Sequence, residues 1–141
     1  MRDIERTFIA IKPDGVKLNL IGEIIRRIEQ KRFRIRAMKM TRPSRELVEE
    51  HYEEHRGTDR FDPLCDFMCS GDVVAMVVEG EGVIRLFRTM LGPFDPGLGK
   101  PGEIRFDLGG TIEESIGHGS DSPKAAEREI DLWFPELEPA A

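Results

Sequence analysis

The pattern of hydrophobic and polar positions predicts alternating strands and helices in the first part of the chain. An apolar run at residues 7–11 stops at Pro13-Asp14-Gly15, which indicates a buried strand followed by a turn. Apolar residues then recur at helical spacing over residues 20–28 and predict an amphipathic helix. At residues 33–37 apolar and basic side chains alternate strictly, which predicts a strand with one solvated face.

The rest of the chain predicts a central strand, a short edge strand and four more helices. The continuous apolar run at residues 73–78 is typical of a strand in a sheet covered on both faces. Residues 92–117 are rich in glycine and proline without a sustained period, and loops of this length are more often functional than idle. A short fourth strand is predicted at residues 115–118. The helices are predicted at residues 44–52, 62–68, 83–91 and 122–133.

These elements predict a single α+β domain over residues 1–141. The order of strands and helices favours one mostly antiparallel sheet covered by helices on one side, and a doubly wound sheet is the alternative. The length of 141 residues suits one hydrophobic core and leaves little room for a second.

Composition and charge restrict the partners of this domain. The chain has 21 basic and 27 acidic side chains and a net charge of −6, which argues against nucleic acid as its main partner. Small phosphate ligands stay possible, because a few basic residues gathered in one cleft can oppose the overall charge.

The charged amino terminus and the lack of a long apolar stretch predict a cytoplasmic protein without a membrane span. Cys65 and Cys69 are expected to be reduced thiols in a helix.

Three histidines are the candidates for special chemistry. His51 and His55 stand four residues apart among glutamates, so a solvated helix face is favoured over a metal site. His118 lies between Gly117 and Gly119, just before a predicted helix whose N-terminus favours anions. Neutral imidazole is a competent nucleophile, so His118 is either a nucleophile toward a phosphorylated ligand or an exposed turn residue.

Two segments of the chain together resemble the nucleoside diphosphate kinase family. They are residues 5–16, Glu-Arg-Thr-Phe-Ile-Ala-Ile-Lys-Pro-Asp-Gly-Val, and residues 118–122, His-Gly-Ser-Asp-Ser, with further matches as far as Phe134. The resemblance implies a ferredoxin-like sandwich with a four-stranded antiparallel sheet. It also implies ping-pong transfer of a γ-phosphoryl group from a nucleoside triphosphate to a nucleoside diphosphate. Mg²⁺ would arrive on the nucleotide phosphates and need few protein ligands, and the chain would form a homo-oligomer, a dimer-based tetramer or hexamer.

Catalytic roles follow from the same resemblance. His118 would be the nucleophile and would pass through a phosphohistidine. Lys12 would reach the ribose 3′-hydroxyl and the transferring phosphate, and Tyr52 matches a tyrosine of the same site. Ser120 and Glu129 match the pair that orients the histidine ring.

Nucleotide-binding roles are implied as well. Arg88 and Arg105 match two arginines that clamp phosphates, a task suited to the guanidinium fork. Without the resemblance, the two arginines would be interpreted as surface charge. Leu64 and Ile112 would help to form a shallow slot for the base.

Three positions depart from the family pattern and keep a second hypothesis open. Arg60 replaces the usual base-stacking aromatic, although its guanidinium can stack or Phe61 can take that place. Phe94 replaces a phosphate-binding threonine, and Ser115 replaces an asparagine near the ribose. The working enzyme is therefore weighed against a low-activity or non-catalytic nucleotide-binding or scaffolding member.

Overall fold

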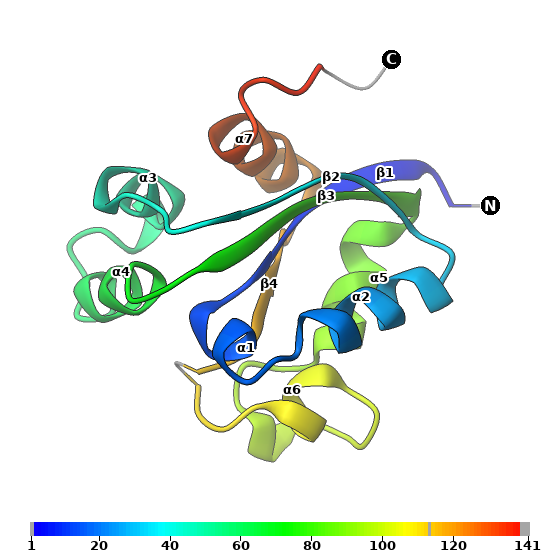
Figure 1. Cartoon of the computed structure of the whole chain (residues 1–141), viewed down its shortest axis with the longest axis horizontal. Coiled ribbons are helices and arrows are strands. Elements are labelled where there is room, and N and C mark those ends of the chain that lie inside the picture. Colours follow the sequence, from blue (N-terminus) through cyan, green and yellow to red (C-terminus); the bar gives the residue numbers. More distant parts are fainter. Residues whose placement is uncertain (1, 113, 139–141) are drawn as a thin grey trace.

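A four-stranded antiparallel sheet in the order β2-β3-β1-β4 forms the centre of the computed structural model (Figure 1). The structure describes residues 2–112 and 114–138, so both ends of the predicted domain, 1–141, lie outside the described residues. The order of elements and strands is the ferredoxin-like α+β arrangement, which confirms the predicted fold class. The strands are β1 (Ile4–Ile11), β2 (Arg34–Thr41), β3 (Val73–Glu81) and β4 (Gly117–Gly119).

Seven α-helices and two 3₁₀ turns connect the strands within the described residues. Two predicted N-caps are confirmed: the Ser44 hydroxyl accepts from the Leu47 amide and the Ser122 hydroxyl accepts from the Ala125 amide, both at 3.1 Å. The helices are α1 (Pro13–Lys17), α2 (Ile21–Gln30), α3 (Arg45–His51), α4 (Phe61–Met68), α5 (Val83–Leu91), α6 (Ile104–Leu108) and α7 (Pro123–Trp133). The 3₁₀ turns are η1 (Glu53–His55) and η2 (Pro96–Leu98).

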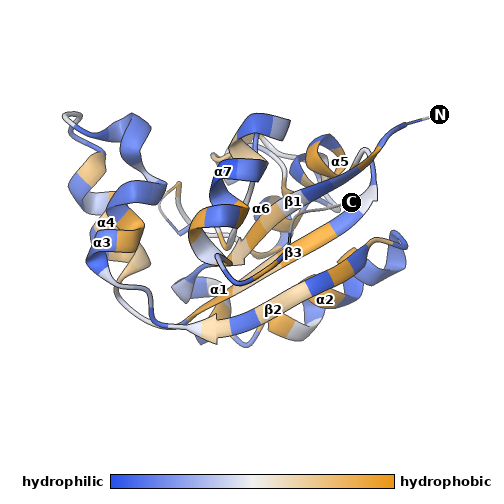
Figure 2. Ribbon diagram, turned by 90° about the horizontal axis from the view of Figure 1, so that it is seen from above, coloured by the Kyte–Doolittle hydropathy of each residue, from blue (hydrophilic) through white to orange (hydrophobic). Residues whose placement is uncertain are grey.

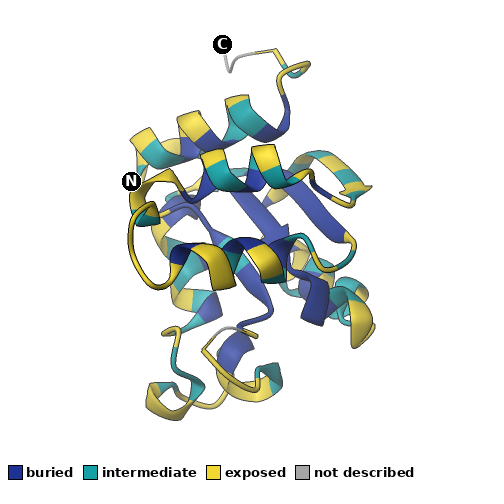
Figure 3. Ribbon diagram, turned by 90° about the vertical axis from the view of Figure 1, so that its left-hand side faces the viewer, coloured by how far each residue is buried: buried dark blue, intermediate teal, exposed yellow. Residues whose placement is uncertain are grey.

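Two hydrophobic layers pack on opposite faces of the sheet, so the prediction of helices on one side was wrong. Phe8 and Ala10 of β1 pack with apolar side chains of α3, α4 and the end of α7, whereas Ile9 and Ile11 pack with those of α2 and α5. Most of β1 and β3 lies buried between these helices, whose outer faces are exposed, whereas the edge strand β2 alternates between exposed and half-buried residues (Figure 3). The reason is visible in β1 and β3, which are apolar on both faces and need cover on both (Figure 2).

Three local predictions need correction. The turn at Pro13-Asp14-Gly15 is the first part of the short helix α1, with proline in its first turn. The segment 92–117 contains η2 and α6 rather than a continuous loop. The fourth strand is Gly117–Gly119, because Ser115 and Ile116 are part of a tight turn before it.

The prediction of reduced cysteines agrees with the structure. Cys65 is buried, Cys69 is partly buried, and both thiols are free. Among the described helices, none is both long and apolar enough to cross a membrane.

Candidate active site

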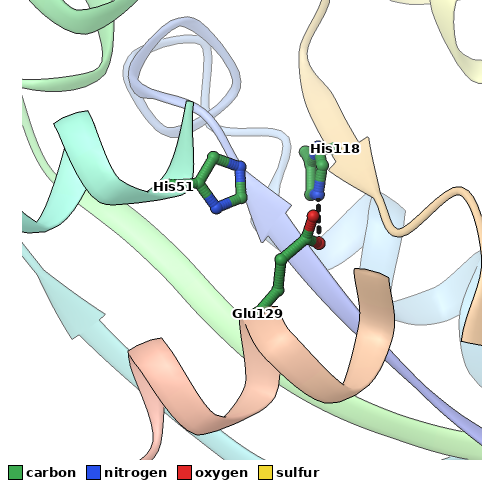
Figure 4. Close-up of side chains that lie close together, drawn as sticks. All are labelled: His51, His118 and Glu129. Atoms are coloured by element: carbon green, nitrogen blue, oxygen red, sulfur yellow. Dashed lines mark hydrogen bonds and ion pairs between the residues drawn. The ribbon is translucent and has the colours of Figure 1, made fainter. Parts of the chain in front are cut away.

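His118 lies on β4, directly opposite Ala10 of β1, and its side chain points toward α7. The ring Nε2 lies 2.8 Å from Oε1 of the buried Glu129, and the same carboxylate oxygen accepts from the Ser120 hydroxyl at 2.8 Å (Figure 4). The Ser120 hydroxyl in turn accepts from the Phe8 amide at 3.1 Å. Because a carboxylate only accepts hydrogen bonds, the imidazole proton lies on Nε2 and the lone pair lies on Nδ1. The structure therefore brings His118, Ser120 and Glu129 together as predicted.

The glycines beside His118 are required by packing. A Cβ on Gly119 would lie 2.8 Å from the Phe87 ring of α5, and one on Gly117 would lie 3.2 Å from Leu91 and 3.3 Å from the Ala10 carbonyl oxygen. The two glycines therefore let β4 lie close to α5 and β1, while His118 between them faces the opposite side of the sheet.

A strained turn precedes His118. Ile116 is fully buried with a φ of 71°, and the Gly117 amide donates to the Ser115 carbonyl at 2.7 Å, which makes a γ-turn. Such backbone conformations cost of order 1–3 kcal/mol and persist only where surrounding contacts hold them. Here the Ile116 amide donates to Asp14 Oδ2 at 2.9 Å, and the Ile116 carbonyl accepts from the Lys12 amide at 2.8 Å.

Arg105 also stabilises this turn by hydrogen bonds. Its guanidinium donates to the carbonyls of Ser115 at 3.1 Å, Gly92 at 2.9 Å and Gly117 at 2.7 Å, and it lies 4.4 Å from the Phe94 ring. Burial and the nearby Arg88 lower the pKa of Arg105 to about 10, so it still carries its charge at neutral pH. The interpretation as surface charge was wrong, because Arg105 is 3% exposed.

Lys12 brings a buried positive charge to the site from the end of β1. It is 4% exposed, and its Nζ donates to the Ser115 hydroxyl at 3.1 Å. Burial, together with the charge of Arg105, lowers the pKa of Lys12 to about 8. Ser115 is fully buried, and its side chain contacts Lys12 directly although it is shorter than the asparagine of the family pattern.

An open pocket lies in front of His118. Arg88 reaches it from α5 and donates to the Gly119 carbonyl at 2.9 Å. Burial raises the pKa of Tyr52 at the pocket wall, so its phenol stays neutral and is able to donate a hydrogen bond. The lining residues are Lys12, His51, Tyr52, Glu54, His55, Arg60, Leu64, Arg88, Phe94, His118, Asp121 and Glu129.

Four residues that the sequence assigned to this site do not line the pocket. Among the described residues, Ser115, Ser120 and Arg105 lie behind its wall, and Ile112 lies outside it with 43% of its surface exposed. Arg60, Leu64 and Phe94 do line the pocket.

His51 was missed, because it was interpreted as part of a solvated helix face. It is 3% exposed, and its ring centroid lies 4.7 Å from that of His118. The spacing of His51 after the buried Val48 places both on the inner stripe of α3, which was the available signal. His55 is partly exposed in η1 and also lines the pocket.

The three side chains in Figure 4 bring nitrogen and carboxylate atoms within 4.8 Å of one another, close enough for one metal ion. Their protonation does not suit a metal, because Nε2 of His118 carries the proton donated to Glu129. In addition, the Trp133 indole N–H donates to Nδ1 of His51 at 3.1 Å, so the proton of a neutral His51 lies on Nε2. The geometry suits a hydrogen-bonded histidine site better than a metal site.

Comparisons with known proteins identify the family of this chain. A family model described as nucleoside diphosphate kinase matches residues 5–139. The nucleoside diphosphate kinase of Methanocaldococcus jannaschii is 51% identical over 134 residues, which cover 95% of this chain and 96% of that protein. Nucleoside diphosphate kinase III, chloroplastic/mitochondrial, of Arabidopsis thaliana is 50% identical over 132 residues, 94% of this chain, but the match spans only 56% of that protein.

Solved structures show the same likeness. A halophilic nucleoside diphosphate kinase from Halobacterium salinarum, in complex with CDP, superposes with a TM-score of 0.92 and is 42% identical, with 99% of this chain and 94% of that chain covered. The apo nucleoside diphosphate kinase from Encephalitozoon cuniculi gives a TM-score of 0.92 at 39% identity, with 97% and 94% of the two chains covered.

Proposed function

Because this chain belongs to the nucleoside diphosphate kinase family of phosphotransferases, we propose that it transfers the γ-phosphoryl group of a nucleoside triphosphate to a nucleoside diphosphate through a phosphohistidine at His118. The observation that supports this most is the pairing of His118 Nε2 with the buried Glu129. That pairing leaves the lone pair of Nδ1 available as the nucleophile.

In the first half-reaction, the Nδ1 lone pair of His118 forms a bond to the γ-phosphorus. The bond between that phosphorus and the oxygen bridging to the β-phosphate breaks, and its electrons leave with the nucleoside diphosphate. The imidazole ring gains positive charge, which the Nε2 hydrogen bond to Glu129 stabilises. A second nucleoside diphosphate then takes the phosphoryl group by the reverse of these steps, which is a ping-pong mechanism.

Positive charge at the pocket balances the phosphates. Lys12 and Arg88 line the pocket beside His118 and are suited to contact the transferring group and the leaving diphosphate. Arg105 lies behind the wall and donates to three carbonyls, so its hydrogen bonds stabilise the turn before His118. Its role as a phosphate clamp stays a prediction. Preorganised charge of this kind lowers the barrier without a further covalent step.

Magnesium fits this site as a companion of the nucleotide. Besides Glu129, the carboxylates of Glu54 and Asp121 line the pocket, next to the cationic Lys12 and Arg88. So few carboxylates suit an ion held mainly by the phosphates, with Asp121 or Glu54 facing its water shell. When bound, Mg²⁺ would neutralise charge on the β- and γ-phosphate oxygens.

The low-activity or non-catalytic member is the second candidate, and it is favoured by Arg60 and Phe94, two exposed residues that line the pocket. The two candidates are separated by incubating the protein with γ-labelled ATP. We expect label on the wild type in an acid-labile, alkali-stable bond, and no label on His118→Ala. An unlabelled wild type, under conditions that label a standard enzyme, would contradict the enzymatic proposal.

Assembly and location are part of the same proposal. A homo-oligomer built from dimers, as a tetramer or hexamer, is supported by Met38 and Met40, which are 53% and 57% exposed on the edge strand β2. Light scattering at several protein concentrations tests it, and a monomer throughout would contradict it. The cytoplasmic location stays a prediction.

A further inference from the structure

His51 stands between Trp133 and His118 in the wall of the pocket, and the mechanism above does not use it. Its Nδ1 accepts the hydrogen bond from the Trp133 indole N–H at 3.1 Å, and both residues are buried. Indole nitrogen only donates, so His51 must offer a lone pair at Nδ1. The hydrogen bond therefore determines which nitrogen of a neutral His51 carries its proton, namely Nε2.

The environment keeps the His51 ring neutral. Burial, followed by the nearby His118, lowers the pKa of His51 well below its ordinary value. The charged and titratable groups around the two histidine rings are Lys12 at the end of β1, Tyr52 and His55 after α3, Arg88 on α5, Asp121 before α7, and Arg128 and Glu129 on α7.

The Nε2–H group of His51 points at His118. Figure 4 shows this nitrogen directed toward the His118 ring, and the two rings meet edge to face at 74° with centroids 4.7 Å apart. An N–H group directed at the π face of an aromatic ring is a weak hydrogen bond, with its positive end toward the negative face of the ring. Such a contact is favourable for a neutral imidazole and unfavourable for a positively charged one.

We propose that His51 is a positioning residue for His118. Trp133 fixes the Nε2–H tautomer of His51. This N–H group contacts the face of the His118 ring, holds the ring in its orientation and disfavours positive charge on it. The inference rests on the proposed function in that His118 is taken as the nucleophile. Glu129 and His51 then act in opposite senses: Glu129 stabilises a positive ring, and His51 limits that stabilisation so that the phosphoryl group can leave again.

Two measurable consequences follow when the N–H group is removed. The protonated His118 ring becomes easier to form, so its titration midpoint moves up by about half a pH unit. The phosphorylated ring is also easier to form, so the equilibrium between the protein plus ATP and the phosphoprotein plus ADP moves toward phosphoprotein by roughly two- to fivefold.

The test uses His51→Phe, which keeps an aromatic ring and removes the N–H group. The double variant His51→Phe with Trp133→Phe removes the indole donor as well, so no buried donor is left without an acceptor. His51→Gln restores an N–H group at a similar reach, and Trp133→Phe alone keeps the His51 ring but releases its tautomer. Cys65→Ala is the matched control, because it loosens the same hydrophobic layer without contacting the pocket.

His118 is titrated by NMR through its carbon-bound ring protons, and the phosphorylation equilibrium is measured with γ-labelled ATP and ADP. We expect both quantities to shift in His51→Phe and in the double variant. In His51→Gln they should return part of the way to the wild-type values. Trp133→Phe should give a smaller shift of the same sign, and Cys65→Ala none. If every His51 variant lowers thermal stability as Cys65→Ala does and leaves both quantities unchanged, His51 has only a packing role. The NMR titration needs no activity, so an unlabelled wild type would contradict the proposed function alone.

Discussion

Two groups of residues at the pocket differ in how firmly they are held. The His118 ring, Glu129 and Ser120 are joined by hydrogen bonds, and Glu129 and Ser120 are buried. In contrast, Phe94 is 46% exposed, and Arg60 at the start of α4 is exposed. Transfer of a phosphoryl group depends on positioning within a fraction of an ångström, whereas contact with a base tolerates change. The departure from the family pattern at position 60, where a base contact is expected, belongs to the tolerant group, whereas Phe94 stands where a phosphate contact is expected.

Removing the carboxylate partner of His118 should cause the largest loss. For Glu129→Ala we expect kcat to fall about 10- to 150-fold, because a charged hydrogen bond of about 1.5–3 kcal/mol to the ring is lost. Steady-state kinetics measures it, with Glu127→Ala on the exposed face of α7 as the control. Equal kcat values in the two variants would show that Glu129 does not preorganise the His118 ring.

The close approach of β4 to α5 should be nearly as sensitive. In Gly119→Ala the new Cβ would lie 2.8 Å from the Phe87 ring, so we expect the free energy of unfolding to fall by about 1–3 kcal/mol. Denaturant unfolding measures this. Gly22→Ala in α2 serves as the control, since a Cβ there meets nothing within 4 Å. A Gly119→Ala protein as stable as the wild type would mean that β4 has room to move.

The buried Lys12 should make activity depend on pH. Its pKa of about 8 in the unliganded site means that Lys12 is charged below pH 8 and loses its proton above it. We therefore expect kcat/KM to fall as the pH rises through 8, by up to tenfold per unit, because kcat/KM reports the groups of the free enzyme. Lys12→Arg keeps its charge over this range, so its profile should stay flat to higher pH. A wild-type profile that is flat to pH 10 would be incompatible with this role.

A substitution at Arg60, where a base contact is expected, should give the smallest effect, and it should strengthen nucleotide binding. Arg60→Phe replaces a guanidinium, which can itself stack, by an aromatic ring, so only part of the about 1–3 kcal/mol of base stacking is gained and KM for nucleotides should fall by up to about fivefold with kcat unchanged. Arg60→Gln separates loss of charge from gain of the ring. A fall in KM that is equal in both variants would show that charge, not stacking, decides base binding at this position.

Much of the fold could be predicted because it is encoded locally. The alternation at residues 33–37 and the apolar run at 73–78 identified β2 and β3, and the caps Ser44 and Ser122 marked where α3 and α7 begin. The sides of the sheet could not be assigned this way. Periodicity shows which residues share a face of one element, but not which other element covers that face.

The candidate site divides in the same manner. His118, Lys12 and Glu129 were found from residue types and a family resemblance, and the structure brings all three to one pocket. His51 and the burial of Arg105 were not found, because both depend on distant partners. Trp133, which fixes the proton of His51, lies 82 positions away along the chain.

The sequence by itself determined the order of the four strands and of the longer helices, the α+β class and the chemical groups available for phosphoryl transfer, but not the short helices α1 and α6. It left open that a chain of net charge −6 could hold a local cluster of positive charge. Tertiary structure alone decided that Arg105 faces the turn before His118, and that His51 faces the nucleophile instead of solvent. The physical reason is that burial and protonation are set by all the neighbours of a side chain, and these are assembled only when β4, α3 and α7 pack against β1.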